Sequence, residues 1–271
     1  MRWQELRTTG DGAQLHVRRL VEPAAPPILL LHGLGVGGAV WQSFARRLLP
    51  ERAAVAPDLR GHGQSDAPRG GYEPRGYALD LAALIEDLRL QPLPVVGHSL
   101  GALVALALAD LRPELVEWLA LLDPPLDSAQ RNPEVPEVYR LRHAPAGELE
   151  GYLRSRSPGS ELLAPLFRHA ADRAFEAMLE HDHTRQALQQ AAHLDMPCLV
   201  VQADPDKGGV LGDAAAQRLT RSLANGELVK IQRASHAVHA THPAQLAETL
   251  KTWDRRARRP PGPGSTAGDA C

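Results

Sequence analysis

Short apolar runs that alternate with helical patterns constrain the fold of this chain most. Five runs have the composition of buried strands, each ended by a turn signal: 27–31, 53–56, 93–96, 118–122 and 198–202. Stretches of helical periodicity lie between or after them: 40–49, 77–90, 100–111, 213–223 and 243–256. This alternation predicts an α/β fold with a mostly parallel sheet covered by helices on both faces. We also expect an antiparallel start, because two strand-like stretches, 6–9 and 14–19, flank a Gly-Asp-Gly turn.

One segment breaks the alternation. From Pro124 to about Met196 the chain shows helical patterning in short pieces separated by proline and glycine, without a convincing strand. We therefore predict a helical cap at 124–195, inserted into a core formed by 1–123 and 196–256. Residues 257–271 are rich in proline and glycine, and we expect a disordered tail there.

Composition narrows the class of protein. With 271 residues, 44% hydrophobic and 23% charged, the chain is long enough to bury a sizeable core. A net charge of −2 without a basic stripe before the tail argues against a nucleic-acid partner. The N-terminus lacks an apolar leader, the longest apolar run is too short for a membrane span, and Cys198 and Cys271 form no disulfide framework. We expect a cytoplasmic protein that acts on a small molecule, and leave its oligomeric state open.

The segment PVVGHSLGALVALALA places one hydroxyl, that of Ser99, in an apolar run. Such a serine usually bonds to a backbone carbonyl one turn back. Here, however, it is the centre of a G-x-S-x-G pattern, with a strand-like run before it and a helix-like run after it. That context is typical of a nucleophile on a tight strand-to-helix turn. A serine nucleophile needs a base and an orienting carboxylate, which we looked for later in the chain.

Position selects the base among twelve histidines. His236 follows a strand-like stretch at 227–232 and precedes the final helix, so it can reach back over the sheet. His239 and His242 are nearby competitors, for which a solvated or capping role is expected. His181 and His183 flank an aspartate in a metal-like spacing, but we interpret them as a solvated helix face and expect no metal.

The glycine-rich turn at 33–38 follows a predicted strand. It lacks the lysine and the Ser/Thr of a phosphate-binding loop, and we expect no cofactor. Such a turn suits a different task, which is to hold the backbone N–H of Leu34 toward a point where negative charge develops. The later stretch at 58–65, DLRGHGQS, is interpreted as a rigid turn without a catalytic role.

The orienting carboxylate has three candidates at strand ends. Asp204 and Asp206 follow the run at 198–202, and Asp123 follows the run at 118–122. Each of them can hold an imidazole in the useful tautomer, and each can equally be a turn residue.

These motifs together, HGLG, DLRGHGQS, GHSLGA and a late Ser-His, resemble the α/β-hydrolase superfamily from Leu15 to Trp253. The resemblance implies Ser99 as nucleophile, His236 as base, and the N–H groups of Leu34 and Leu100 as the oxyanion hole. The usual G-x-x-D ending of the late strand implies Asp206 as the acid, with an alanine in the glycine's place. The A-D-P-x-x-G variant implies Asp204, which we predict, and dehalogenase-like relatives place the acid at Asp123.

The same resemblance implies a serine hydrolase that cleaves an ester, lactone or thioester of a small, mainly apolar substrate. Epoxide hydrolases and haloalkane dehalogenases are disfavoured, because they use a carboxylate where this chain has Ser99. The alternatives are an acyltransferase or perhydrolase with the same triad, and a ligand-binding protein that kept the fold.

Overall fold

A computed structural model describes residues 2–21, 26–48, 51–90, 92–126, 134–156, 160–180 and 183–258. Its centre is an eight-stranded sheet in the order β1-β2-β4-β3-β5-β6-β7-β8. The strands are β1 Trp3–Thr9, β2 Gln14–Leu20, β3 Pro27–Leu31, β4 Ala53–Pro57, β5 Leu93–His98, β6 Val116–Leu122, β7 Cys198–Gln202 and β8 Gly226–Lys230. β2 pairs antiparallel with both β1 and β4, and the pairs from β4 to β8 are parallel. The predicted fold class is confirmed.

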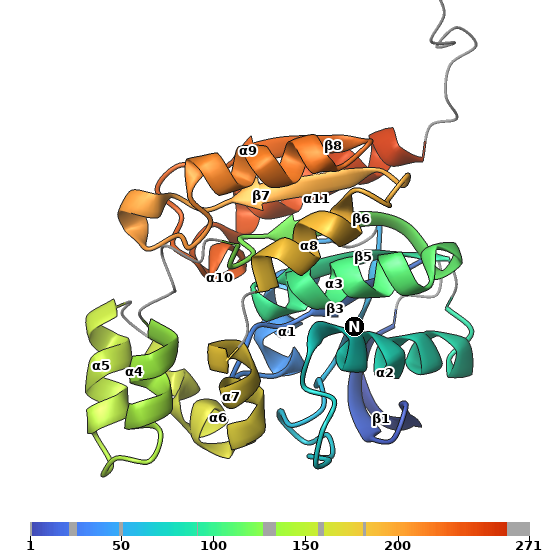
Figure 1. Ribbon diagram of the computed structural model, residues 1–271. Coiled ribbons are helices and arrows are strands. Elements are labelled where there is room, and N and C mark those ends of the chain that lie inside the picture. Colours follow the sequence, from blue (N-terminus) through green and yellow to red (C-terminus); the bar gives the residue numbers. More distant parts are fainter. Residues whose placement is uncertain are drawn as a thin grey trace, which may run out of the picture.

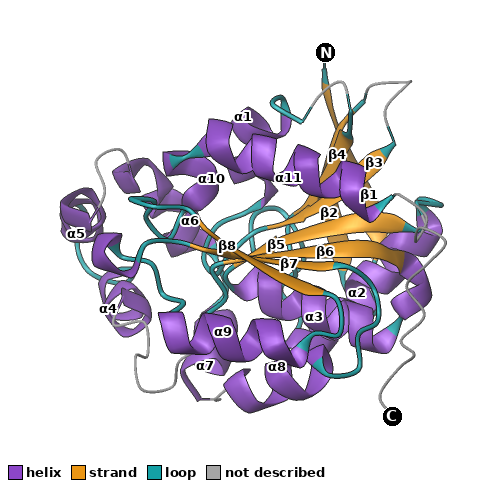
Figure 2. Cartoon of the chain, turned by 90° about the horizontal axis from the view of Figure 1, so that it is seen from above, coloured by secondary structure: helices purple, strands orange, loops and turns teal. Residues whose placement is uncertain are grey.

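Helices cover both faces of the sheet (Figure 1). Seen from above, one side carries α1 (Gln42–Ala45), α10 (Val238–Thr241) and α11 (Pro243–Ala257) (Figure 2). The other side carries α2 (Pro74–Asp87), α3 (Leu100–Leu111), α8 (His183–Ala191) and α9 (Asp213–Ser222).

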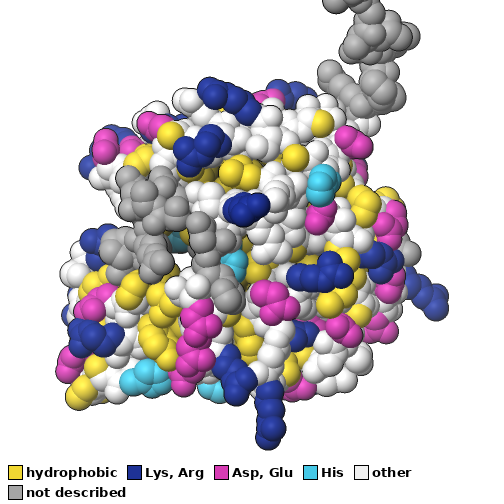
Figure 3. Space-filling model, viewed as in Figure 1, with side chains coloured by type: hydrophobic (Ala, Val, Ile, Leu, Met, Phe, Trp, Pro, Cys, Tyr) yellow, Lys and Arg dark blue, Asp and Glu magenta, His cyan; other side chains and the backbone are white. Residues whose placement is uncertain are grey.

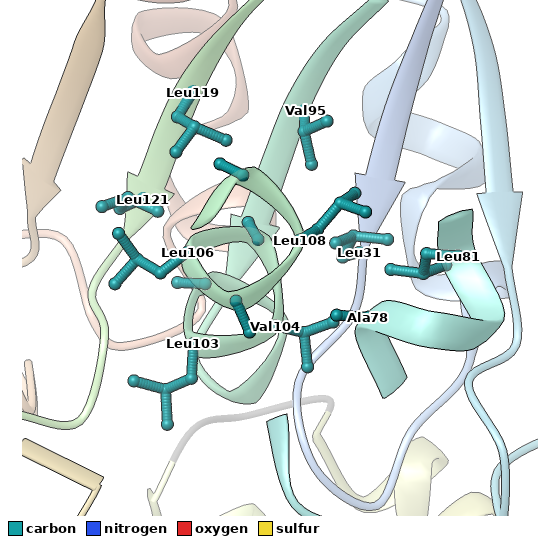
Figure 4. Packing of buried hydrophobic residues seen from close by; sticks show 14 of the residues in the cluster. Leu31, Ala78, Leu81, Val95, Leu103, Val104, Leu106, Leu108, Leu119 and Leu121 are labelled. Carbon is teal, nitrogen blue, oxygen red and sulfur yellow. The ribbon is translucent and has the colours of Figure 1, made fainter. Parts of the chain in front are cut away.

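The central strands are apolar throughout because they are buried on both faces. In β3, Leu29 and Leu31 join the hydrophobic cluster on the α3 side, whereas Ile28 and Leu30 join the cluster on the α11 side. Helix α3 is itself enclosed, with every side chain from Leu100 to Ala109 buried. Figure 4 shows its leucine and valine side chains among those of β3, β5, β6 and α2. This burial explains the uninterrupted apolar run after Ser99.

A group of short helices covers the carboxyl ends of the strands. It contains α4 (Glu134–Leu141), α5 (Glu148–Arg156), the 3₁₀ turn η3 (Ser160–Leu163), α6 (Ala164–His169) and α7 (Asp172–Glu180). The four α-helices of this group share a hydrophobic cluster around Leu141, Leu149 and Phe175. Helix α8 follows in the predicted cap range but packs Ala187 and Ala191 into the core cluster. The boundaries 124 and 195 stay predictions.

The structure differs from the sequence prediction at several element ends. The helix expected at 40–49 is a 3₁₀ turn, η1 (Gly38–Trp41), followed by the single turn of α1. Helix α2 begins three residues earlier than predicted, at Pro74. Ala257, predicted to start the tail, is the last residue of α11, and residues 259–271 lie outside the described part of the chain.

Candidate active site

Ser99 lies between β5 and α3 in a strained backbone conformation, with φ 54° and ψ −117°. A non-glycine residue at such a positive φ is uncommon and is found preferentially at functional sites. The two glycines of the motif are required by space. A Cβ on Gly97 would collide with the carbonyl of Gly101, and one on Gly101 with the carbonyl of Leu31. The turn therefore presents Ser99, partly exposed, at the wall of a cavity.

His236 lies on the loop between β8 and α10, beside the same cavity. Its Nδ1 is 2.7 Å from Oδ2 of Asp123, whose side chain is fully buried at the end of β6. This carboxylate also accepts hydrogen bonds from three backbone amides of the segment after β7, those of Ala203, Val210 and Leu211. Asp123 has a φ of 46°, so both ends of this arrangement, Ser99 and Asp123, have strained backbones.

The predicted contact between Asp204 and His236 is not what the structure has. Asp204 caps the 3₁₀ turn η4 (Pro205–Lys207), with Oδ1 accepting from the N–H of Asp206. Its Oδ2 accepts from the N–H of Arg233 at 2.8 Å. The hydrogen bonds from these two amides lower the pKa of Asp204, the one from Arg233 most. Asp204 therefore shapes the loop that carries His236, and Asp123 contacts its imidazole. Asp206 is exposed at the cavity wall.

The two amides predicted for the oxyanion hole lie on turns beside Ser99. Leu34 lines the cavity just after β3, and Leu100 is the first residue of α3. Among the described residues, neither N–H donates a hydrogen bond to a protein acceptor. The first N–H groups of a helix lack intrahelical partners, which makes them natural anion donors.

The loop of Leu34 is fixed from behind by His32, which is fully buried. Its Nε2 accepts from the N–H of Leu59 at 2.9 Å, so its Nδ1 carries the proton and donates to the carbonyl of Gly33 at 2.7 Å. Burial lowers the pKa of His32, in keeping with this neutral tautomer.

The DLRGHGQS segment is a rigid turn, as predicted, and the structure adds a buried ionic network to it. Asp58 is 1% exposed and accepts from Gly38 N–H, Gln64 N–H and the guanidinium of Arg18. Burial opposes ionisation of Asp58, but these hydrogen bonds and charges keep its pKa below the usual value. Arg60 forms a bidentate ion pair with Asp80 of α2.

Two further histidines line the cavity and were not predicted as part of the site. His98 precedes Ser99, and its ring centroid is 4.5 Å from that of His236 and 4.9 Å from that of His239. Burial lowers the pKa of His239 to about 4 and that of His98 well below its usual value, with His236 as the second cause for both. The sequence offered one signal: a polar ring in an apolar strand end directly before the serine.

The cavity has a volume of about 590 Å³. Its apolar wall comes from both the core and the cap: Leu34, Val36, Val40, Val135, Val138, Leu153, Leu163, Phe167 and Phe175. Polar side chains, among them Ser155, Arg156, Ser160 and Lys207, also line it. Another cap arginine, the buried Arg142, donates to the backbone carbonyls of Arg168 and Ala170 and stacks over Phe175.

No group of histidine, cysteine or acidic side chains suited to a metal ion occurs among the described residues, which include His183 but not His181. In that same part of the chain, none of the helices combines the length and apolar character that a membrane crossing requires.

The chain belongs to the alpha/beta hydrolase family, whose model matches residues 28–249. It is similar to an uncharacterized protein of Mycobacterium tuberculosis, with 37% identity over 124 residues, which is 46% of this chain and 35% of that protein. It is also similar to the lipase LipV of M. tuberculosis, with 41% identity over 112 residues, 41% of each chain. The matched stretch thus spans well under half the length of these two curated relatives.

Among solved structures, an esterase from Thermogutta terrifontis superposes with a TM-score of 0.77. The match covers 94% of this chain and all of that one, at 22% identity. This likeness shows that the chain has the α/β-hydrolase fold, in agreement with the family match.

Proposed function

We propose that this protein is a serine hydrolase that cleaves an ester, lactone or thioester through an acyl-enzyme on Ser99, with His236 as base and Asp123 as the orienting acid. The observation that carries the proposal is the 2.7 Å contact between His236 Nδ1 and the buried Asp123 carboxylate, beside a cavity that also contains Ser99. A carboxylate can accept a hydrogen bond only from an Nδ1 that carries a proton. In the neutral imidazole, Nε2 of His236 is then unprotonated and can act as a base.

The proposed reaction begins when His236 Nε2 takes the proton of the Ser99 hydroxyl as its Oγ attacks the substrate carbonyl. The imidazolium that forms is stabilised by Asp123, whose own charge is held by three backbone amides. His236 then gives the proton to the leaving alcohol or thiol. The acyl group of the substrate remains bound to Ser99 Oγ as an ester. A water molecule, deprotonated by the same nitrogen, releases the acid and restores the serine.

We propose that the amides of Leu34 and Leu100 donate hydrogen bonds to the attacked carbonyl oxygen and stabilise the negative charge that develops on it. Both have no acceptor in the described protein, and loss of one such donor typically costs about 10² to 10³ in rate. The apolar wall of the cavity supports an acyl or alcohol group of mainly hydrocarbon character. The relatives' names, a lipase and an esterase, agree with acyl-bond chemistry.

The test uses p-nitrophenyl acetate and butyrate together with a fluorophosphonate probe that labels activated serines. The wild-type protein is expected to hydrolyse the esters and to be labelled, and Ser99→Ala is expected to lose both, with at least a ~10⁴-fold fall in kcat. Ser222→Ala is the matched control and keeps both, because Ser222 is also a partly exposed serine and its hydroxyl bonds within α9.

Two other results are informative. A wild-type protein that is neither labelled nor active contradicts the proposal and favours a ligand-binding role for the fold. If the protein is labelled, products formed with ethanol or hydrogen peroxide present distinguish hydrolysis from acyl transfer or perhydrolysis.

A further inference from the structure

We propose that His98 is a positioning residue that holds the base loop, residues 231–237, in register with Ser99. The inference rests on the proposed function of Ser99 and His236. It comes from the hydrogen bond between Nε2 of His98 and the backbone carbonyl of His236, at 2.9 Å, which links positions 138 residues apart in the chain.

His98 contacts three parts of the site at once. It immediately precedes Ser99 at the end of β5. Its ring lies against the turn after β3, since a Cβ on Gly33 would be 3.1 Å from His98 Nδ1 and 3.3 Å from the Cβ of Ser99. Its other nitrogen bonds to the base loop. One rigid ring thus spans the nucleophile turn, the turn of the oxyanion amides and the loop of the base.

The base loop needs such a tie because it is not a regular element and is only partly buried. Ser235, His236 and Ala237 are all partly exposed. Upstream, the loop is held to Asp204 through the amide of Arg233 and the carbonyl of Ala234. The described contacts of the His236 main chain come from His98 and from Val238, whose N–H bonds to the same carbonyl.

The hydrogen bond from His98 to the carbonyl of His236 requires that Nε2 of His98 carry a proton. A carbonyl accepts only from a protonated Nε2, so in the neutral ring Nδ1 is unprotonated. The side chain is buried, and a second positive charge beside His236 would oppose formation of the His236 imidazolium. A neutral donor therefore serves this place better than a lysine or arginine.

The substitutions separate the donor from the ring. His98→Phe keeps a flat ring of similar size and removes the hydrogen bond, and His98→Gln removes the ring and keeps an N–H donor at a similar reach. Tyr72→Phe is the matched control, because Tyr72 is also a buried ring that donates a hydrogen bond to a backbone carbonyl, that of Pro68, but lies outside the cavity.

The measurements are kcat and KM for p-nitrophenyl butyrate, and the downfield proton NMR signal of His236 Nδ1–H, which is bonded to Asp123. For His98→Phe we expect kcat to fall by about 10- to 100-fold at nearly unchanged KM, as for a small misplacement of a catalytic group. The NMR signal is expected to broaden or vanish. His98→Gln restores most of kcat and the signal, and Tyr72→Phe leaves both unchanged.

The proposal is overturned if folded His98→Phe retains wild-type kcat and the NMR signal, or if His98→Gln is as impaired as His98→Phe. Folding is checked by the melting curve and by circular dichroism of each variant. The NMR signal needs no substrate and no reactive serine. If the wild-type protein proves inactive toward every ester, the proposed function fails, yet the signal still tests whether His98 orders the base loop.

Discussion

Asp123 receives four hydrogen bonds, one from the His236 imidazole and three from backbone amides, whereas the two bonds to the Asp204 carboxylate come from amides alone. The two carboxylates therefore differ in what they do for the base. Asp123 fixes the tautomer of the ring, and Asp204 shapes the backbone that carries it.

This difference predicts unequal effects for the same substitution. Asp123→Asn removes the charge that stabilises the imidazolium and favours the wrong tautomer, so kcat for a p-nitrophenyl ester is expected to fall by about 10⁴-fold. Asp204→Asn keeps an amide acceptor and a good capping residue, and less than about a tenfold loss is expected. Equal losses, or the larger loss at Asp204, would contradict the assignment of the acid.

The sequence predicted Ser99 as the nucleophile and His236 as the base, and it offered Asp123 only as the third candidate for the acid. The reason is physical, because β6 and β7 are neighbours and their carboxyl ends lie at the same edge of the sheet. Which carboxylate meets the imidazole depends on loop paths that a sequence does not specify. An aspartate followed by proline is typical of an N-cap and a first helical position, which is how Asp204 and Pro205 are used. Asp123 is also followed by a proline, so this local signal does not separate the two carboxylates.

At the scale of elements, the sequence predicted the buried strands and α3 well, because continuous apolar runs have few alternatives to burial. It failed at 40–49, where two glycines precede a helical pattern. A Cβ on Gly38 would collide with the carbonyl of Ala56, so η1 packs directly against β4. This close packing, rather than local helix propensity, determines the conformation there.

Glycines in α3 and α5 give an opposite pair of predictions. Gly101→Ala places a methyl group against the carbonyl of Leu31, and we expect loss of the folded protein or a fall of several kcal/mol in its stability. Gly151→Ala adds a methyl group in the middle of α5, where nothing lies within 4 Å, and is expected to stabilise the protein by about 0.5–1 kcal/mol. Urea unfolding of the two variants measures both effects. A destabilised Gly151→Ala would contradict the open surroundings of that position.

For the whole molecule, charge is distributed without a dominant patch on the face in Figure 3, where basic and acidic side chains are interspersed. The interior is less uniform, because six histidines are buried among the described residues and burial lowers the pKa of four of them: His32, His62, His98 and His239. All four lie close to the loops that carry Leu34, Ser99 and His236 or behind them. Protonation of these four side chains is therefore expected to change the free energy of unfolding.

Burial lowers the pKa of His62 to about 3 and that of His239 to about 4, and it lowers those of His32 and His98 as well. In the unfolded chain a histidine titrates near pH 6.5, so below that pH the unfolded state binds protons that the folded state excludes. The stabilising contribution of these neutral side chains is complete above pH 6.5 and is lost as the pH falls toward their folded values. Each such histidine lowers the free energy of unfolding by up to about 1.4 kcal/mol per pH unit.

We therefore expect urea unfolding to give a free energy that decreases steadily from pH 6.5 to pH 5.5, a range above the unfolded titrations of aspartate near 3.9 and of glutamate near 4.3. In His62→Phe the slope is expected to fall by up to one proton, because one of the four excluded protonation sites is gone. An unchanged slope in His62→Phe would mean that the His62 ring is protonated in the folded protein, and a free energy that stays constant over this range would mean the same of all four rings. The neutral tautomers assigned to His32 and His98 would then be wrong, and with them the hydrogen bonds by which the oxyanion turn and the base loop are held.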